Sequence, residues 1–264
     1  MDLKLKNKTA FISGSTAGIG FAIAKGLLNE GAKVIINGRS EQSVEVALNK
    51  LRKINSNADI SGFAADFSNI EEVKSLCEDL PDLDILVNNV GIYKSASFFE
   101  MDDSDWQEQY EINVMSGVRL SRYFLPNMLK QNWGRILFVS SECAELVPPD
   151  MLAYSMTKTA MLSVAKGLAQ LTKSSGVTIN SIIPGSTLSE GAEQFLEDEA
   201  VKSGKTKAAI EADFFKDVRT SSLLQRFASV DEVASTTVYY CSPLASATNG
   251  AAIKIEGGST GGLI

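Results

Sequence analysis

One stretch decides the fold: Thr9-Ala10-Phe11-Ile12-Ser13-Gly14-Ser15-Thr16-Ala17-Gly18-Ile19-Gly20. Residues 9–13 form an apolar run typical of a buried strand, and residues 19–30 predict an amphipathic helix. The glycines between them permit a tight turn and let backbone amides approach a pyrophosphate. The start of the helix offers free N–H groups and positive potential to the same anion. Strand, turn and helix together predict a dinucleotide site, with a plain helix-start turn as the alternative.

Short β-prone apolar runs alternate with longer amphipathic stretches along the whole chain. Continuously apolar runs, such as residues 136–139, are typical of parallel strands that are covered on both faces. Strands are predicted at residues 9–13, 33–37, 59–64, 85–88, 135–140, 177–183 and 251–255. Helices between them include residues 41–54, 104–130 and 152–174. The pattern predicts an α/β fold: one doubly wound, Rossmann-type domain over residues 1–264, with a seven-stranded parallel sheet and helices on both faces.

The segment after the sixth strand breaks this alternation. Residues 185–229 contain no predicted strand, only polar, helix-prone sequence with apolar positions such as Phe195, Phe214 and Phe215. The segment leaves the carboxyl end of a strand, where open α/β sheets bind their ligands. It predicts a helical substrate lid over about residues 186–229, and a helical decoration is the alternative.

Composition excludes several classes of function. The chain of 264 residues has a net charge of −7 with scattered basic residues, which argues against a nucleic-acid partner. No apolar run reaches the roughly 18 residues that span a bilayer. Residues 1–6 lack a signal-peptide core, so a cytoplasmic location is expected. The sequence has no histidine and its cysteines, Cys77, Cys143 and Cys241, lie far apart, so no metal site is predicted.

Tyr154 and Lys158 are four residues apart on a predicted helix, so their side chains share one face. A nearby cation favours phenolate and lowers the tyrosine pKa from about 10. Tyr154 is therefore a candidate proton donor and acceptor. The pair alone is a weak indication, because amphipathic helices often carry a half-buried tyrosine beside a solvated lysine.

The end of the second strand indicates which cofactor is preferred. Chains that bind NAD commonly place an acid here for the ribose 2′-hydroxyl. This chain has Gly38 at that position and Arg39 next to it, a combination that suits a 2′-phosphate. NADP is therefore predicted, with NAD possible and a solvated loop arginine as the alternative reading of Arg39.

Taken together, the motifs resemble the short-chain dehydrogenase/reductase family in its compact, single-domain branch. The resemblance covers nearly the whole chain. Its parts occur in the family's order: Gly14, Gly18, Ile19 and Gly20 in the turn, Asp66, then Asn89 and Gly91, Asn113, Ser141, Tyr154, Lys158, and Pro184 with Gly185.

The resemblance implies an oxidoreductase that interconverts a ketone or aldehyde and an alcohol. Hydride would come from the nicotinamide and the proton from Tyr154. Ser141, thirteen residues before the tyrosine as in the family, would hold the carbonyl oxygen. Lys158 would bond the nicotinamide ribose and depress the tyrosine pKa, and Asn113 would hold a water that links Lys158 to solvent.

The same resemblance implies a set of cofactor contacts. The phosphates would meet the turn, Arg39 the 2′-phosphate, Asp66 and Phe67 the adenine, Asn89 the adenosine ribose, and Thr187 the carboxamide. Tyr154 and Lys158 also belong to this set. Its remaining members are Gly14, Ser15, Thr16, Gly18, Ile19, Gly20, Gly91, Pro184 and Gly185.

Candidate substrate-wall residues are mostly apolar, which favours a mostly apolar small-molecule substrate. Glu142 and Glu145 would oppose an anionic one if they face the pocket, and solvated loop carboxylates are the alternative. The predicted helices at 104–130 and 152–174 carry many apolar residues. In the family such helices pair across a two-fold axis, so a homo-oligomer, most often a tetramer, is expected. The same faces could instead be covered within one chain.

Two other functions fit parts of the pattern. A dinucleotide-binding regulator without catalysis would share the fold, but such proteins usually lose the tyrosine or the lysine. A sugar-nucleotide epimerase would share the tyrosine–lysine pair, but it needs a larger C-terminal substrate domain. Turnover of NADPH with ketones separates the enzyme from the regulator.

Overall fold

The computed structural model describes residues 1–56 and 58–262, and its centre is one parallel sheet. The strands lie in the order β3-β2-β1-β4-β5-β6-β9. Their bounds are Thr9–Ile12 (β1), Lys33–Gly38 (β2), Ile60–Ala64 (β3), Ile85–Asn88 (β4), Gly134–Val139 (β5), Val177–Pro184 (β6) and Ala252–Ile255 (β9). These strands confirm the seven predicted ones, with ends shifted by at most one residue. Because the chain builds outward from β1 to β3 and then adds β4 on the other side, the crevice that binds ligands in such sheets opens between β1 and β4.

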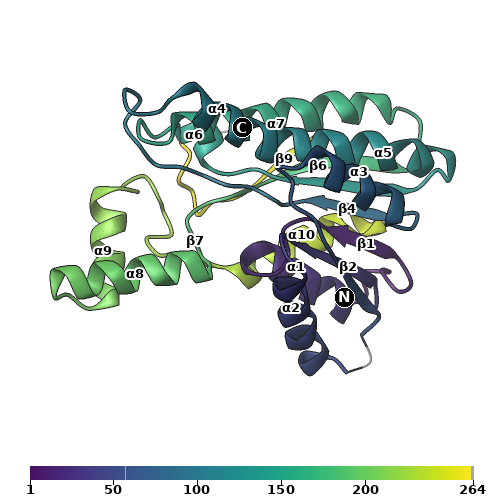
Figure 1. The fold of residues 1–264 in the computed structure, drawn as a ribbon, viewed down its shortest axis with the longest axis horizontal. Coiled ribbons are helices and arrows are strands. Elements are labelled where there is room, and N and C mark those ends of the chain that lie inside the picture. The colour runs from purple at the N-terminus through teal and green to yellow at the C-terminus, as the bar shows by residue number, and fades with distance from the viewer. Residues whose placement is uncertain (57, 263–264) are drawn as a thin grey trace.

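Helices cover both faces of the sheet (Figure 1). One face carries α1 (Gly18–Asn29), α2 (Glu41–Ile54) and α10 (Val230–Tyr240), and the other carries α3 (Ile70–Asp79), α5 (Ser116–Lys130) and α7 (Leu152–Leu171). Successive side chains of a strand point to opposite faces. Ala10 and Ile12 accordingly belong to the first core and Phe11 to the second. The predicted doubly wound fold is confirmed.

The helix predicted over residues 104–130 is not uniform. It comprises α4 (Asp103–Tyr110), a π-helical turn η1 (Glu111–Met115) and α5. Asn113 lies inside η1, where its side chain bonds both polar groups of the Ile92 backbone at 2.7 and 2.9 Å. These bonds offset the free-energy cost of the wide turn. The helical periodicity of the sequence does not reveal this turn. Such π turns frequently mark functional sites.

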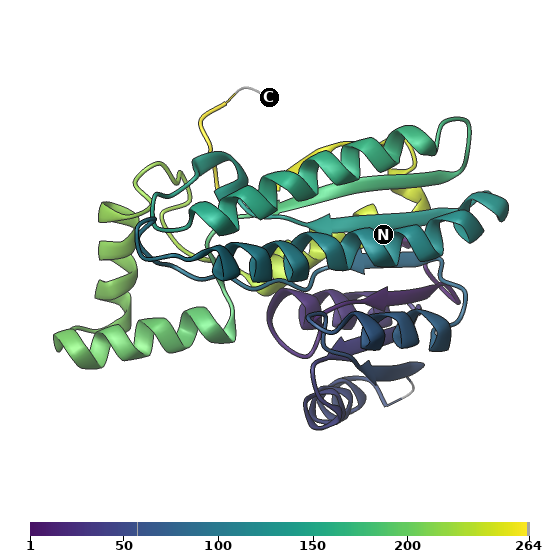
Figure 2. The same cartoon turned by 45° about the horizontal axis from the view of Figure 1, so that its top comes forward.

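Residues 185–229 form a small unit beside the sheet. It contains β7 (Thr187–Leu188), α8 (Glu190–Ser203), α9 (Lys207–Asp217) and β8 (Ala228–Ser229). Both views show α8 and α9 projecting away from the sheet (Figures 1 and 2). The prediction of no strand here was wrong, because β7 and β8 pair in parallel. Two-residue strands are too short to show a periodic pattern.

The projecting unit has a core of its own, made of Leu196, Phe215 and Phe227. The rings of Phe214 and Phe227 stack at 5.1 Å between centroids. Two further short helices, α6 (Cys143–Leu146) and η2 (Pro243–Ala245), complete the fold. Over residues 1–56 and 58–262, no helix is long and apolar enough to cross a membrane.

Candidate active site

The glycine-rich turn after β1 is shaped by positions where a side chain would not fit. Gly14 and Gly18 have φ angles of +60° and +58°, which favour glycine. A Cβ at Gly20 would lie 2.5 Å from the side-chain nitrogen of Asn89. The turn therefore brings the start of α1 to the crevice between β1 and β4. At this helix start, the Gly18 N–H donates to the Glu190 carboxylate at 2.8 Å, so an anionic group already occupies that position.

One residue of the predicted turn is used internally. The Ser15 hydroxyl donates to the Ile12 carbonyl at 2.7 Å and accepts from the Asn37 N–H at 3.0 Å. Its own N–H donates to the Asn37 carbonyl at 2.8 Å, and its side chain is fully buried. Ser15 thus ties β1 to β2, and its side chain does not face the crevice.

A first cavity, of about 360 Å³, lies at the ends of β2 and β3. Arg39 and Asp66 line it, and the pKa of Asp66 is lowered by the Ser68 backbone N–H, the Ser68 hydroxyl and the Arg39 charge. Phe67 lines the cavity too, although its side chain is 2% exposed and packs in the core. A Cβ at Gly38 would lie 2.5 Å from Thr16 Cγ2, so an acid there would have to displace its neighbours. Other predicted residues around this cavity are Gly14, Thr16, Asn89 and Gly91.

A second cavity, of about 440 Å³, shares Asn89 and Gly91 with the first. It brings together three of the four predicted catalytic residues, Ser141, Tyr154 and Lys158. The predicted cofactor residues Ile19, Pro184, Gly185 and Thr187 also line it. The two cavities therefore form neighbouring parts of one site at the carboxyl edge of the sheet.

Helix α7 sets the geometry of the pair. Lys158 Nζ lies 5.4 Å from the centre of the Tyr154 ring and donates to the Val139 carbonyl at the end of β5, at 2.9 Å. The Ser140 hydroxyl donates to the Lys158 carbonyl at 2.9 Å, so this serine fastens α7 to the sheet. Ser141 instead lines the cavity and hydrogen-bonds the tyrosine. The two adjacent serines thus point to different places.

The pKa of Tyr154 shifts in the direction opposite to the prediction. Burial raises the pKa of Tyr154 above its usual value, and only the hydrogen bond with Ser141 opposes this. Lys158 is itself 3% exposed, and burial lowers its pKa to about 8. The prediction that Lys158 depresses the tyrosine pKa was therefore wrong for this structure, because loss of water raises that pKa and Lys158 is not among the groups that lower it.

Asn113 connects the turn after β4 to helix α7. Its side chain is fully buried and, besides Ile92, donates to the Thr157 hydroxyl at 2.9 Å. A Cβ at Gly91 would lie 3.2 Å from Lys158 Nζ and 3.4 Å from Asn113 Oδ1. The four predicted catalytic residues are thus neighbours, although the water relay assigned to Asn113 stays a prediction.

The outer wall of the second cavity comes mainly from other segments. The Tyr93 ring meets the Tyr154 ring edge-on at 5.9 Å. Phe195, Phe214 and Phe227 reach in from the α8–α9 unit. Sequence reasoning missed Arg219, which lines the cavity and pairs with Glu142. No local signal could have indicated it, because these two residues are 77 positions apart.

The two glutamates after Ser141 have different environments. Glu142 is 3% exposed and lines the cavity, which contradicts the alternative of a solvated loop carboxylate. Glu145 is exposed and pairs with Lys254 at 2.8 Å, away from the cavity. Across the described parts of the chain, no cluster of acidic and cysteine side chains could hold a metal ion.

Comparisons with known proteins show which family the chain belongs to. A family model described as short chain dehydrogenase matches residues 8–200. The uncharacterized oxidoreductase YvrD of Bacillus subtilis is 44% identical over 261 residues, 98% of each chain. The 3-oxoacyl-acyl-carrier-protein reductase FabG of Aquifex aeolicus is 32% identical over 263 residues, 98% of this chain and 99% of the relative. L-sorbose reductase from Gluconobacter frateurii, solved in complex with NADPH and L-sorbose, matches over 100% of both chains with a TM-score of 0.93 and 29% identity. The chain therefore belongs to the short-chain dehydrogenase/reductase family of oxidoreductases.

Proposed function

We propose that this protein is an NADP(H)-dependent oxidoreductase that interconverts a ketone or aldehyde and an alcohol, with Tyr154 as the proton donor. One observation carries the proposal: Ser141 and Lys158 converge on Tyr154 in a cavity that adjoins the glycine-rich turn. A tyrosine phenol carries its proton at neutral pH, the form that a reductase needs.

The residues divide the chemistry between them. NADPH, when bound, supplies the hydride that reaches the carbonyl carbon. Tyr154 gives its hydroxyl proton to the carbonyl oxygen, where negative charge develops. Ser141 holds that oxygen beside the phenol, and a preorganised donor at this position stabilises the developing charge. Lys158 and Asn113 hold the cofactor ribose and the surrounding backbone in place.

The residues around the first cavity fit NADP better than NAD. Arg39 supplies a guanidinium for a 2′-phosphate. Its positive charge also lowers the pKa of Asp66, which lines the same cavity. An acid at position 38 that binds a 2′-hydroxyl would have to displace the Thr16 and Ser43 side chains. The NADPH complex of L-sorbose reductase, a structural relative, supports the same choice.

The proposal treats residues 1–264 as one dinucleotide-binding domain, in which about residues 186–229 act as a substrate lid. Lid residues Phe195, Phe214 and Arg219 line the cavity that holds Tyr154. The unit has a core of its own, which holds its two helices together. Three buried free cysteines, Cys77, Cys143 and Cys241, support a location in the reducing cytoplasm.

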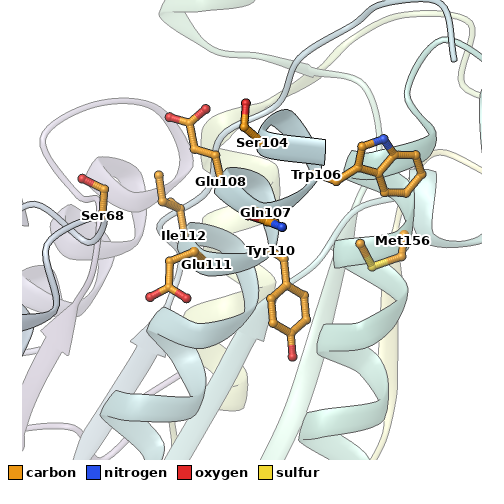
Figure 3. A pocket seen from close by; sticks show the side chains of 9 residues that line it. All are labelled: Ser68, Ser104, Trp106, Gln107, Glu108, Tyr110, Glu111, Ile112 and Met156. Atoms are coloured by element: carbon orange, nitrogen blue, oxygen red, sulfur yellow. The ribbon is translucent and has the colours of Figure 1, made fainter. Parts of the chain in front are cut away.

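The proposal also includes a homo-oligomer, with a tetramer favoured. A hollow of about 720 Å³ lies on the outer face of α4 and η1 and contains none of the candidate catalytic residues. Trp106 and Tyr110 line it together with Met156 of α7 (Figure 3). Tyr110 is 41% and Met156 38% exposed, so this face offers apolar surface to a second copy.

The test is NADPH oxidation, followed by absorbance, with a panel of ketones and aldehydes. We expect turnover by the native protein and a loss of at least about a hundredfold in kcat for Tyr154→Phe, because general acid catalysis typically contributes that much. NADPH binding, measured by fluorescence, should stay within a few-fold. Tight NADPH binding without turnover of any compound would instead identify a regulator, and near-normal turnover by the variant would exclude Tyr154 as the acid.

A further inference from the structure

The second cavity contains an arginine whose guanidinium is only partly used. Arg219 lines this cavity, and its side chain is 14% exposed. Its Nε donates to Glu142 Oε1 at 2.9 Å, and its Nη2 donates to Cys143 Sγ at 3.9 Å. A guanidinium has five N–H donors, and a thiol is a weak acceptor. Contacts within the described residues therefore leave most of these donors free or weakly bound.

The free donors are at Nη1 of Arg219. Within residues 1–56 and 58–262, Nη1 has no hydrogen-bond partner, and it is not one of the polar atoms that the protein encloses. It is therefore open to a ligand in the cavity that Arg219 lines. Glu142 Oε2 differs, because the protein encloses it and no ligand reaches it. Of this ion pair, the cavity consequently presents the guanidinium.

The guanidinium is also held in a fixed position. Glu142 is 3% exposed, and its Oε1 accepts from the Ser186 hydroxyl at 3.0 Å as well as from Arg219. The guanidinium carbon lies 5.8 Å from the centre of the Phe214 ring. These contacts fix the edge formed by Nη1 and Nη2, so a ligand there meets donors that need little further ordering.

The charges around the cavity favour an anion. Its lining contains two cations, Arg219 and Lys158, and one acid, Glu142. Lys158 lies beside Tyr154 and donates to the Val139 carbonyl, so Arg219 is the cation left for the far end of a substrate. The two terminal nitrogens of a guanidinium match the two oxygens of a carboxylate. A phosphate monoester carries about two charges at neutral pH, more than this lining balances.

The remaining wall limits the rest of the ligand. Tyr93 and Phe195 contribute aromatic surface, which suits a hydrocarbon chain. Cys143 joins Arg219 to the catalytic serine, because its N–H donates to Ser141 Oγ at 3.2 Å and its Sγ accepts from Nη2. One residue therefore separates the guanidinium from the hydroxyl that would hold the carbonyl oxygen.

We propose that Arg219 is a specificity-determining residue whose free guanidinium edge binds a carboxylate of the substrate. The preferred substrates are then oxo acids in which a short hydrocarbon chain separates the ketone from the carboxylate. This assignment rests on the proposed carbonyl reduction. It keeps the expected apolar chain and revises the expectation that Glu142 opposes an anionic substrate, because Arg219 pairs with that carboxylate.

The experiment compares kcat/KM for oxo acids and for their methyl esters, with NADPH. The acids 3-oxobutanoate, 4-oxopentanoate and 5-oxohexanoate vary the length of the chain. In at least one pair the native protein should prefer the acid by at least about tenfold, because a hydrogen bond to a charged group is worth that much. In Arg219→Gln the ratio of acid to ester efficiencies should fall by at least about tenfold.

Two further variants make the result specific. Arg219→Gln leaves Glu142 without its cation, so the double change of Arg219→Gln with Glu142→Gln removes both charges together and should lower the ratio in the same way. Arg226→Gln is the matched control. Arg226 follows the same helix, pairs with the exposed Glu232 and lies outside the cavity, so this variant should keep the native ratio.

The outcomes separate this inference from the function on which it rests. Equal losses on acid and ester in both Arg219 variants would mean that the ion pair only holds the lid, and the inference would fail while the reductase stands. A native protein that prefers the ester in every pair, or does not distinguish the two, would overturn the inference in the same way. Absence of turnover with every ketone would overturn the proposed function itself.

A binding measurement tests the carboxylate site without turnover. Hexanoate and hexanamide are titrated calorimetrically into the native protein saturated with NADP. Hexanoate should bind at least about tenfold more tightly than the neutral amide, and Arg219→Gln should abolish this difference. Equal affinities of the two ligands for the native protein would show that Arg219 binds no carboxylate, and the inference would be wrong.

Discussion

Removal of the Lys158 charge should change how stability depends on pH. Burial lowers the pKa of Lys158 from 10.5 to about 8. Each pKa unit is worth about 1.4 kcal/mol, so holding this ammonium in the folded chain costs about 3 kcal/mol at neutral pH. Between the two pKa values the unfolded chain binds more protons than the folded one, and stability therefore rises with pH across that window.

The perturbation is Lys158→Met, which keeps an unbranched side chain and removes the charge. The free energy of unfolding, from urea denaturation at pH 7, 8 and 9, is compared between the two proteins. Relative to the variant, the native protein should gain about 1 kcal/mol between pH 7 and 9. Loss of the hydrogen bond to the Val139 carbonyl changes the variant's free energy of unfolding by the same amount at every pH. It therefore leaves the slope of that free energy against pH unchanged.

Other groups also change the free energy of unfolding as pH rises. Their contributions cancel when the native protein is compared with the variant. Burial raises the pKa of Cys77 to about 11 and that of Cys241 to about 12, which lowers stability as pH rises in both proteins. Only the difference between native protein and variant reports Lys158. Parallel stability curves would show that its pKa is not depressed, and the account of the site by burial would be refuted.

Two further variants test the cofactor site. Arg39→Asp should lower kcat/KM for NADPH at least tenfold and shift the ratio of NADPH to NADH efficiencies towards NADH. Arg52→Asp, an exposed change on α2, is the control and should leave that ratio unchanged. An unchanged ratio in Arg39→Asp would show that Arg39 does not bind the 2′-phosphate. Glu190→Gln should tighten NADPH binding about two- to five-fold in a fluorescence titration. The reason is that the Glu190 carboxylate, which accepts from the Gly18 N–H, repels the pyrophosphate at the same helix start. Unchanged or weaker binding would contradict this competition.

Most of the fold could be predicted because its signals are local. The apolar run at residues 136–139 and the turn around Gly14 each contain enough information to predict a strand and a tight turn. The pairing of β7 with β8 could not be predicted, because each strand has two residues and depends on its partner. The π turn at Asn113 depends in the same way on bonds to Ile92, a residue 21 positions earlier.

The candidate site shows the same difference between local signals and long-range contacts. Ser141, Tyr154 and Lys158 could be selected because their spacing is visible in the sequence. Arg219 could not, because its partner Glu142 lies in a distant segment and only the folded chain brings the two together. Contacts across such distances leave no periodic trace, so the outer wall of the second cavity was predicted less well than the residues beneath it.

The error in the tyrosine pKa has a general cause. In the sequence, the only visible neighbour of Tyr154 is a cation four residues away, and pairwise reasoning predicts a lower pKa. In the structure, the phenol is enclosed by Tyr93, Ser141 and Cys143 from other segments, and the loss of water raises the pKa instead. The lysine responds to the same enclosure in the opposite sense, because burial disfavours the charged form of both groups. Burial therefore disfavours the phenolate of Tyr154, and the proton stays on the phenol at neutral pH.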